Sequence, residues 1–375
     1  MKYISEFRQP KLVEKIVQRI KRIAQNLERE IKLMEVCGTH AMMILRYGIK
    51  QLLPANIKLI SGPGCPVCVT PDLYIDKACT YARKGFLIAT FGDMMRVPGS
   101  NGSLIEEKSK GGKIKVVYSP VDALKLAESF PEEKVVFLGI GFETTAPTVA
   151  ASVAIAKERK ISNYMVLSGH KLIPPAMKAL VQGGKVKIDG FLCPGHVSTI
   201  IGSKAYEFIA EDYHIPCVVA GFEPVDILQS IYLLLLQISQ NEAKVENEYA
   251  RSVSKEGNLT AKKIMSKVFT KSSSVWRGLG MIEESGLKLK EDYFQHDVEV
   301  RFPLEVFSSS VEDKGCRCGE ILQGLIEPPQ CPLFAKECNP SRPYGPCMVS
   351  VEGACNIYYR FGKDRCQDSE VKWKI

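Results

Sequence analysis

Cysteine is the residue type that dominates the candidate chemistry of this chain. Its 375 residues include 13 cysteines, and seven of them fall in the last 60 residues. The N-terminal segment has no apolar signal core, so we expect a cytoplasmic protein. In that setting, clustered thiols are more typical of metal ligands or redox groups than of structural disulfides.

The first motif is Cys37-Gly38-Thr39-His40, at the end of an apolar strand and the start of a helix. In an open α/β sheet, that position faces the crevice where ligands bind. A helix N-terminus favours the thiolate, which makes Cys37 a candidate nucleophile or metal ligand. A buried cysteine beside a capping threonine is an equally good interpretation of this motif alone.

The second motif, Cys65-Pro66-Val67-Cys68, follows the next predicted strand. Two sulfurs at this spacing can form a disulfide or one half of a zinc site. No other C-x-x-C occurs in the chain, which favours a redox dithiol over zinc.

Three further turns follow predicted strands and open helices, at 141–145, 193–198 and 221–224. Their free backbone N–H groups could hold an anion, and Glu143 and His196 could donate or accept protons. Glycine and threonine also cap helices where no ligand is present. None of these turns has a Walker A or G-x-G-x-x-G pattern, so no motif supports a nucleotide site.

The C-terminal cysteines form the last candidate group. Thiolates in such number suit zinc or an iron–sulfur cluster. Their spacing matches neither a two-knuckle zinc ribbon nor a ferredoxin. Seven also exceed the four that one cluster takes; they are Cys316, Cys318, Cys331, Cys338, Cys347, Cys355 and Cys366.

The motifs lie in a part of the chain where short apolar runs alternate with helical stretches, and these elements must hold the motifs in position. Such a pattern predicts parallel sheets covered on both faces, hence an α/β fold. Strands are expected at 32–36, 58–61, 86–90, 115–118, 134–138, 164–168, 190–193 and 216–220. Helices are expected at 10–30, 71–84, 120–129, 146–159, 174–181, 198–211 and 261–269.

We expect four segments along the chain. Residues 1–30 are an N-terminal helix, 31–140 and 141–240 are two α/β lobes, and 241–375 is a C-terminal cysteine-rich domain. That last domain is poor in apolar residues near its end, so a metal cluster would supply the missing stabilisation.

Composition narrows the classes of partner. The chain is 45% hydrophobic and 25% charged, with a net charge of +8. No basic block or basic–aromatic stripe occurs, so we expect no nucleic-acid partner. The longest uncharged apolar run, at 227–241, is shorter than the ~20 residues of a membrane helix, so we expect no membrane partner.

The motifs taken together resemble the HypD family of hydrogenase formation and maturation proteins. CGTH at 37–40, GPGCPVC at 62–68, GFETTAP at 141–147, PGHVS at 194–198, GFEP at 221–224 and WRGLG at 276–280 occur in order, before the cysteine array. The resemblance implies two Rossmann-like lobes and a third, mainly irregular and helical region that holds a [4Fe-4S] cluster.

The resemblance also implies a function. Such proteins are scaffolds that help to build the Fe(CN)₂CO unit of [NiFe]-hydrogenases with the small chaperone HypC, while HypE delivers cyanide as a thiocyanate. On that basis Cys37 would hold the iron under assembly, and His40 could orient or protonate a ligand. Cys65 and Cys68 would be a redox-active pair beside it.

The resemblance divides the C-terminal cysteines into two groups. Cys318 and Cys347 would form a thiol/disulfide pair beside the cluster, and Cys366 has no implied role. The cluster ligands would be Cys316, Cys331, Cys338 and Cys355. Electrons would then pass from the cluster to Cys318/Cys347, to Cys65/Cys68 and to the iron site.

Two other functions remain open from the residues. A cluster-containing disulfide reductase acting on a protein partner would use the C-x-x-C and the cluster, but it leaves Cys37 unexplained. A zinc-stabilised interaction module would use the C-terminal cysteines alone.

Overall fold

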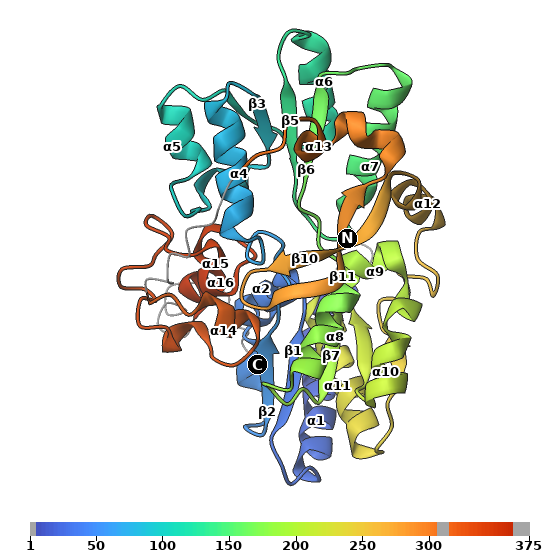
Figure 1. Ribbon diagram of the computed structural model, residues 1–375. Coiled ribbons are helices and arrows are strands. Elements are labelled where there is room, and N and C mark those ends of the chain that lie inside the picture. The colour runs from blue at the N-terminus through green and yellow to red at the C-terminus, as the bar shows by residue number, and fades with distance from the viewer. Residues whose placement is uncertain (1–4, 306–314, 363–375) are drawn as a thin grey trace.

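Two parallel β-sheets form the framework of the protein, in a computed structural model that describes residues 5–305 and 315–362 (Figure 1). The first sheet has the order β2-β1-β7-β8-β9, with strands β1 (Ile31–Glu35), β2 (Ile57–Ser61), β7 (Gly190–Pro194), β8 (Cys217–Ala220) and β9 (Val245–Asn247). The second has the order β4-β3-β5-β6, with β3 (Leu87–Thr90), β4 (Ile114–Val116), β5 (Val135–Gly139) and β6 (Tyr164–Ser168).

Helices connect these strands and cover the sheets, which gives the α/β fold that the pattern predicted and the two Rossmann-like lobes that the resemblance implied (Figure 1). The α-helices of the lobes are α1 (Pro10–Gln25), α2 (Gly38–Arg46), α3 (Ile49–Leu52), α4 (Asp72–Arg83), α5 (Leu104–Ser109), α6 (Pro120–Ser129), α7 (Ala146–Glu158), α8 (Ile173–Gly183), α9 (Gly195–Ile201), α10 (Glu207–Tyr213) and α11 (Pro224–Ser239).

The remaining helices are short or lie in the C-terminal part. They are α12 (Leu259–Val268), α13 (Val298–Arg301), α14 (Cys318–Leu322), α15 (Pro346–Val349) and α16 (Ala354–Phe361). Single turns of 3₁₀-helix occur at η1 (Ser5–Arg8), η2 (Gly92–Arg96), η3 (Ser203–Tyr206), η4 (Glu291–His296) and η5 (Pro328–Gln330).

Local sequence explains why these elements form. Strand β5 is apolar and buried along its whole length, as expected of a central parallel strand. Helix α6 begins with a capping box, in which the Ser119 and Asp122 side chains each bond the other's backbone N–H, and Pro120 occupies the first turn. Helix α1 buries Ile16 and Ile20 in the core that it shares with α11.

All eight predicted strands are present, and their ends differ from the prediction by no more than two residues. The sheets do not follow the predicted boundary at residue 140, however. Strands β1 and β2 pair with β7 to β9, while β3 to β5 pair with β6, so both predicted lobe ranges contribute strands to both sheets. Hydrophobic periodicity reveals strands but not their pairing partners, because parallel pairing joins segments far apart in sequence.

The segment after residue 240 differs most from the prediction. Strand β9 completes the first sheet, and β10 (Phe269–Trp276) forms an antiparallel hairpin with β11 (Gly280–Leu289). Figure 1 shows this hairpin between the two lobes. Its strands are mostly polar and half exposed, so they lack the apolar run that marked the other strands.

The helix predicted at 198–211 is broken into α9, η3 and α10. Gly202 causes the break, with a φ of +84° that only glycine adopts readily. A side chain at this position would also collide with the backbone of Lys255.

The cysteine-rich C-terminal region packs against the first lobe. Helix α16 buries Ile357 against Ala41 and Leu45 of α2. The Lys50 ammonium lies 2.7 Å from a Glu327 carboxylate oxygen and 2.5 Å from the Tyr358 hydroxyl. Within the described ranges, no helix is long and apolar enough to span a membrane.

Candidate functional site

Cys37 lies where strand β1 ends and helix α2 begins, and it is 7% exposed. Its backbone N–H donates to the Glu35 carboxylate at 2.9 Å. The loop that carries the C-x-x-C packs directly on it: the Gly38 N–H donates to the Gly64 carbonyl at 3.0 Å. A Cβ on Gly64 would collide with the Cys37 backbone, so glycine is required for this close approach.

Burial changes the protonation expected of Cys37. The helix N-terminus was predicted to favour the thiolate, and the N–H groups of His40 and Thr39 do act in that direction. Burial outweighs them and, with the negative charges of Glu352 and Glu35, raises the pKa of the Cys37 thiol to about 12. The residue is therefore a neutral thiol at pH 7 until a cation replaces its proton.

Glu35 is an acidic group inside the core at the end of β1. It is 3% exposed, and burial raises its pKa to about 8, against the opposing hydrogen bonds from the Cys37 N–H and the Ser61 side chain. At neutral pH this carboxyl is mostly protonated, and it ties the Cys37 backbone to the strand that precedes it.

Two of the predicted histidines pack on one aromatic ring. The centroids of His40 and His196 lie 4.8 and 4.1 Å from that of Phe222. His40 Nε2 lies 2.9 Å from the Gly221 carbonyl and 3.2 Å from the Ala220 carbonyl, so Nε2 carries the proton.

His40 is neutral at pH 7. Burial lowers its pKa to about 4. Its Nδ1 is buried and has no hydrogen-bond partner among the described residues, which leaves a lone pair available to a ligand. The pKa of His196 is also lowered by burial, although this ring lies at the surface.

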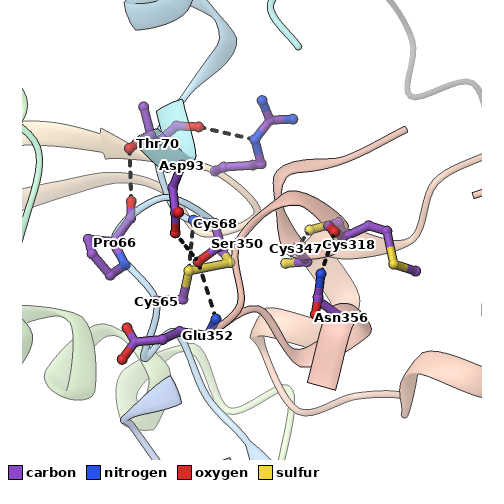
Figure 2. Close-up of a disulfide and its surroundings, with 12 residues drawn as sticks. Cys65, Pro66, Cys68, Thr70, Asp93, Cys318, Cys347, Ser350, Glu352 and Asn356 are labelled. Atoms are coloured by element: carbon purple, nitrogen blue, oxygen red, sulfur yellow. Dashed lines mark hydrogen bonds between the residues drawn. A yellow bond between two sulfur atoms is a disulfide. The ribbon is translucent and has the colours of Figure 1, made fainter. Parts of the chain in front are cut away.

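The C-x-x-C residues, Cys65 and Cys68, are joined by a disulfide, with 5.3 Å between their Cα atoms (Figure 2). Both are buried, at 3% and 0% exposed. The Cys68 N–H also contacts Cys65 Sγ at 3.3 Å. The fold therefore brings this pair beside Cys37, through the contact between Gly64 and Gly38.

The C-terminal region closes over the same loops. The Thr39 hydroxyl donates to the Glu352 carboxylate at 2.7 Å, and Gly38 abuts the Glu352 backbone so closely that a side chain would collide. The Ser350 hydroxyl lies 3.2 Å from an Asp93 carboxylate oxygen (Figure 2). Glu352 therefore contacts the first turn of α2, as Glu35 contacts the residue before it.

Six of the seven C-terminal cysteines lie in the described residues, and all six belong to one packed cluster. Cys318 and Cys347 are free thiols whose sulfurs are 2.8 Å apart (Figure 2). Burial raises the pKa of Cys355, and the charges of Cys318, Cys316, Cys338 and Cys331 raise it further, so these four thiols lie near it. Cys366 lies outside the described residues.

The described side chains place no three His, Cys, Asp or Glu groups around a point that could hold a single metal ion. An iron–sulfur cluster is a larger object, and each of its cysteines binds a different iron. Three buried cysteines, 331, 338 and 355, and the half-buried Cys316, with no acidic side chain among the groups that act on Cys355, fit such a cluster.

Glu143 lies apart from Cys37. One of its oxygens accepts the Ile173 N–H at 3.0 Å, and the other is buried with no partner in the part of the chain that the structure describes. Burial raises its pKa to about 7. It lines a cavity of about 1420 Å³ with Leu172, Phe269 and Leu287, and among the described residues no hydrogen bond joins it to Cys37, His40 or His196.

Sequence reasoning missed Glu35 and Glu352 as neighbours of Cys37. A charged residue in the apolar run IKLMEV was a usable signal for Glu35, because acidic groups in buried strands need a specific reason. No local signal marked Glu352, which reaches the site only through the docking of the C-terminal region.

Comparison with known proteins identifies the family of the chain. Residues 11–362 match the family model described as HypD, hydrogenase formation hypA family. The hydrogenase maturation factor HypD of Escherichia coli is 45% identical over 380 residues, which cover 99% of this chain and 100% of that protein.

Other relatives are similarly close. The HypD of Azotobacter vinelandii is 44% identical over 97% of this chain and 98% of its own length. A putative hydrogenase expression/formation protein of Methanocaldococcus jannaschii is 44% identical over 93% of this chain and 97% of its own length. The chain therefore belongs to the HypD family of hydrogenase maturation factors.

Proposed function

We propose that this protein is the scaffold on which the Fe(CN)₂CO unit of [NiFe]-hydrogenases is assembled. In this proposal Cys37 holds the iron together with a cysteine of a HypC-like partner, and a HypE-like protein delivers cyanide as a thiocyanate. The observation that carries it is the packing of the Cys37 loop on the Cys65–Cys68 loop, which places a fixed sulfur beside a redox pair.

Iron that carries cyanide and CO prefers soft thiolate ligands. Because the pKa of the Cys37 thiol is raised to about 12, iron binding must displace its proton. His40, with a pKa of about 4, is a poor proton donor at neutral pH, so we infer that it orients a ligand. Because cyanide and CO carry no hydrogen, its Nδ1 can accept a hydrogen bond only from a protonated group such as a water molecule at the site.

Release of cyanide from a thiocyanate consumes two electrons and one proton, and it returns a thiol and cyanide. A Cys65/Cys68 dithiol supplies both electrons by closing its disulfide and releases two protons. The disulfide present in the structure corresponds to the state after that step. The free thiols of Cys318 and Cys347 can then reduce it, transferring two electrons and two protons and closing a disulfide of their own.

We propose Cys316, Cys331, Cys338 and Cys355 as the ligands of a [4Fe-4S] cluster. When bound, such a cluster supplies single electrons to the neighbouring Cys318/Cys347 pair. This pair would connect one-electron and two-electron chemistry, since a dithiol stores two electrons. We further propose that the protein works in the cytoplasm, where thiols are kept reduced.

The relay is tested by replacing Cys65 and Cys68 separately with alanine. Each variant is purified anaerobically with the HypC-like partner, and its cyanide-bearing iron is measured by infrared spectroscopy. We expect both variants to lose the cyanide bands while keeping iron and acid-labile sulfide at wild-type amounts. Cyanide-bearing iron at wild-type level in either variant would disprove the relay, and zinc without sulfide would favour an interaction module.

A further inference from the structure

The tip of the β10–β11 hairpin, which lies between the two lobes, contacts the C-x-x-C loop. In the middle of β11, the Ser285 carbonyl accepts the Leu172 N–H at 2.9 Å, beyond the end of β6. Near its tip Trp276 is fully buried, donates from Nε1 to the Ser285 hydroxyl at 2.8 Å and stacks on Phe142. These contacts fix the residue that follows, Arg277.

Arg277 holds the chain that leaves the disulfide. Its backbone N–H donates to the Val69 carbonyl at 2.9 Å, one residue after Cys68. Its Nε donates to the Thr70 carbonyl at 3.1 Å, and its terminal nitrogen pairs with Asp72 at the start of α4. The Arg277 side chain is 15% exposed and that of Asp72 is 37% exposed, so the bond to the Thr70 carbonyl is better shielded from water than the ion pair.

The same turn touches the other sulfur pair. Gly278 faces Gly319 so closely that a Cβ on Gly278 would lie 2.5 Å from the Gly319 Cα. Gly319 directly follows Cys318, and Gln323 Nε2 donates to the Gly278 carbonyl at 2.6 Å.

We propose that Arg277 is a positioning residue whose forked side chain holds the Cys65–Cys68 loop in register with the Cys318/Cys347 pair, so that the second pair can reduce the first. This inference rests on the proposed relay. Figure 2 shows Cys65 and Cys68 on one segment of the chain and Cys318 and Cys347 on another, with Thr70 on the loop after Cys68. The two sulfur pairs belong to different parts of the fold. Arg277 at the hairpin tip contacts the loop of the first pair, and the neighbouring Gly278 contacts the segment of the second, so this turn sets the position of one pair relative to the other.

The fork matters because a guanidinium offers several donors in a fixed plane, whereas an ammonium is a single point. Arg277→Lys therefore keeps the charge but cannot serve both the Thr70 carbonyl and Asp72. Arg277→Gln removes the charge and the fork. Asp72→Asn removes only the ion pair. Arg317→Gln is a matched control, since it removes a cation beside the C-terminal cysteines that pairs with Glu320 instead.

The test follows both sulfur pairs in the anaerobic full-length protein carrying its iron–sulfur cluster. After a pulse of dithionite, free thiols are alkylated at set times and assigned by mass spectrometry. We expect reduction of Cys65–Cys68 to slow at least tenfold in Arg277→Gln and Arg277→Lys, and about threefold in Asp72→Asn. Reduction at Cys318/Cys347 and the melting temperature should stay at wild-type values, and Arg317→Gln should match wild type throughout.

A second readout does not depend on electron transfer. Hydrogen–deuterium exchange over residues 65–72 should become at least tenfold faster in Arg277→Gln and remain unchanged in Arg317→Gln. The proposed role of Arg277 would be disproved if Arg277→Lys showed the wild-type exchange rate over residues 65–72. It would equally be disproved if this variant showed the wild-type rate of Cys65–Cys68 reduction. If the dithionite pulse does not reduce Cys65–Cys68 in the wild-type protein, the proposed relay is wrong. If the pulse reduces this pair equally fast in wild type and in the Arg277 variants, the relay stands and only the role of Arg277 is wrong.

Discussion

At the scale of single residues, the environment of Cys37 is set by burial more than by the helix that it opens. Glu35 illustrates this, because its carboxyl sits in the core with a pKa raised to about 8. In the unfolded chain a glutamate ionises near about pH 4.3. The folded state therefore holds this proton more tightly, and the contribution of Glu35 to stability is lost as pH rises from about 4.5 to about 8.

Glu35→Gln should remove this loss, since the amide stays neutral and its oxygen can still accept the Cys37 N–H. We expect the free energy of unfolding at pH 7.5 to rise by about 1–3 kcal/mol, since one pKa unit corresponds to about 1.36 kcal/mol. Between pH 4.5 and 8, the free energy of unfolding should also decline less steeply in this variant than in wild type. Urea denaturation at several pH values measures both effects.

Glu107→Gln is the matched control for Glu35→Gln. Glu107 is equally buried, but hydrogen bonds from Arg83 lower its pKa, so its contribution is present at neutral pH and lost as pH falls. This substitution should therefore destabilise the protein at pH 7.5. A Glu35→Gln variant that is also less stable at this pH would show that the carboxyl is ionised in the folded protein.

At the scale of elements, the close contact between two strand–helix loops creates the site. Gly64→Ala should disrupt it, because the added methyl group collides with the Cys37 backbone. We expect a loss of about 1–3 kcal/mol in the free energy of unfolding, as for other overpacked sites, and faster alkylation of Cys37 by iodoacetamide.

Gly183→Ala provides the comparison, because nothing lies within 4 Å of the added methyl group in the last turn of α8. Its stability should match or exceed that of wild type, by up to about 1 kcal/mol. If both variants show the same stability and the same alkylation rate at Cys37, the two loops are not as tightly packed as the structure indicates.

Some of these features could be predicted from the sequence and others could not. Short apolar strands and proline-led helices follow local rules, so the eight strands and the motif-bearing turns between them were predictable. The pairing of β1 with β7 was not, because it joins residues more than 150 positions apart. The polar β10–β11 hairpin had no apolar run to mark it, and Arg277 and Glu352 reach the site only through tertiary packing.

At the scale of the whole molecule, three parts of the chain meet around Cys37 and the C-x-x-C loop. The lobe of the first sheet supplies the Cys37 loop, the β10–β11 hairpin between the lobes holds the C-x-x-C loop, and the C-terminal region supplies Glu352 and the second sulfur pair. This convergence suits a scaffold that holds one metal atom while ligands and electrons arrive from different sides. A disulfide reductase would need the sulfur pairs but not the buried Cys37 and His40.

The most direct measurement is the infrared spectrum of the anaerobically purified protein with its HypC-like partner, comparing wild type with Cys37→Ala. Cys193→Ala is a useful control, since Cys193 is equally buried but lies in strand β7. We predict cyanide and CO stretching bands in wild type and Cys193→Ala that disappear in Cys37→Ala. Bands that persist in Cys37→Ala, or that are absent from the wild-type protein of cells making active hydrogenase, would contradict assembly of the iron unit on Cys37.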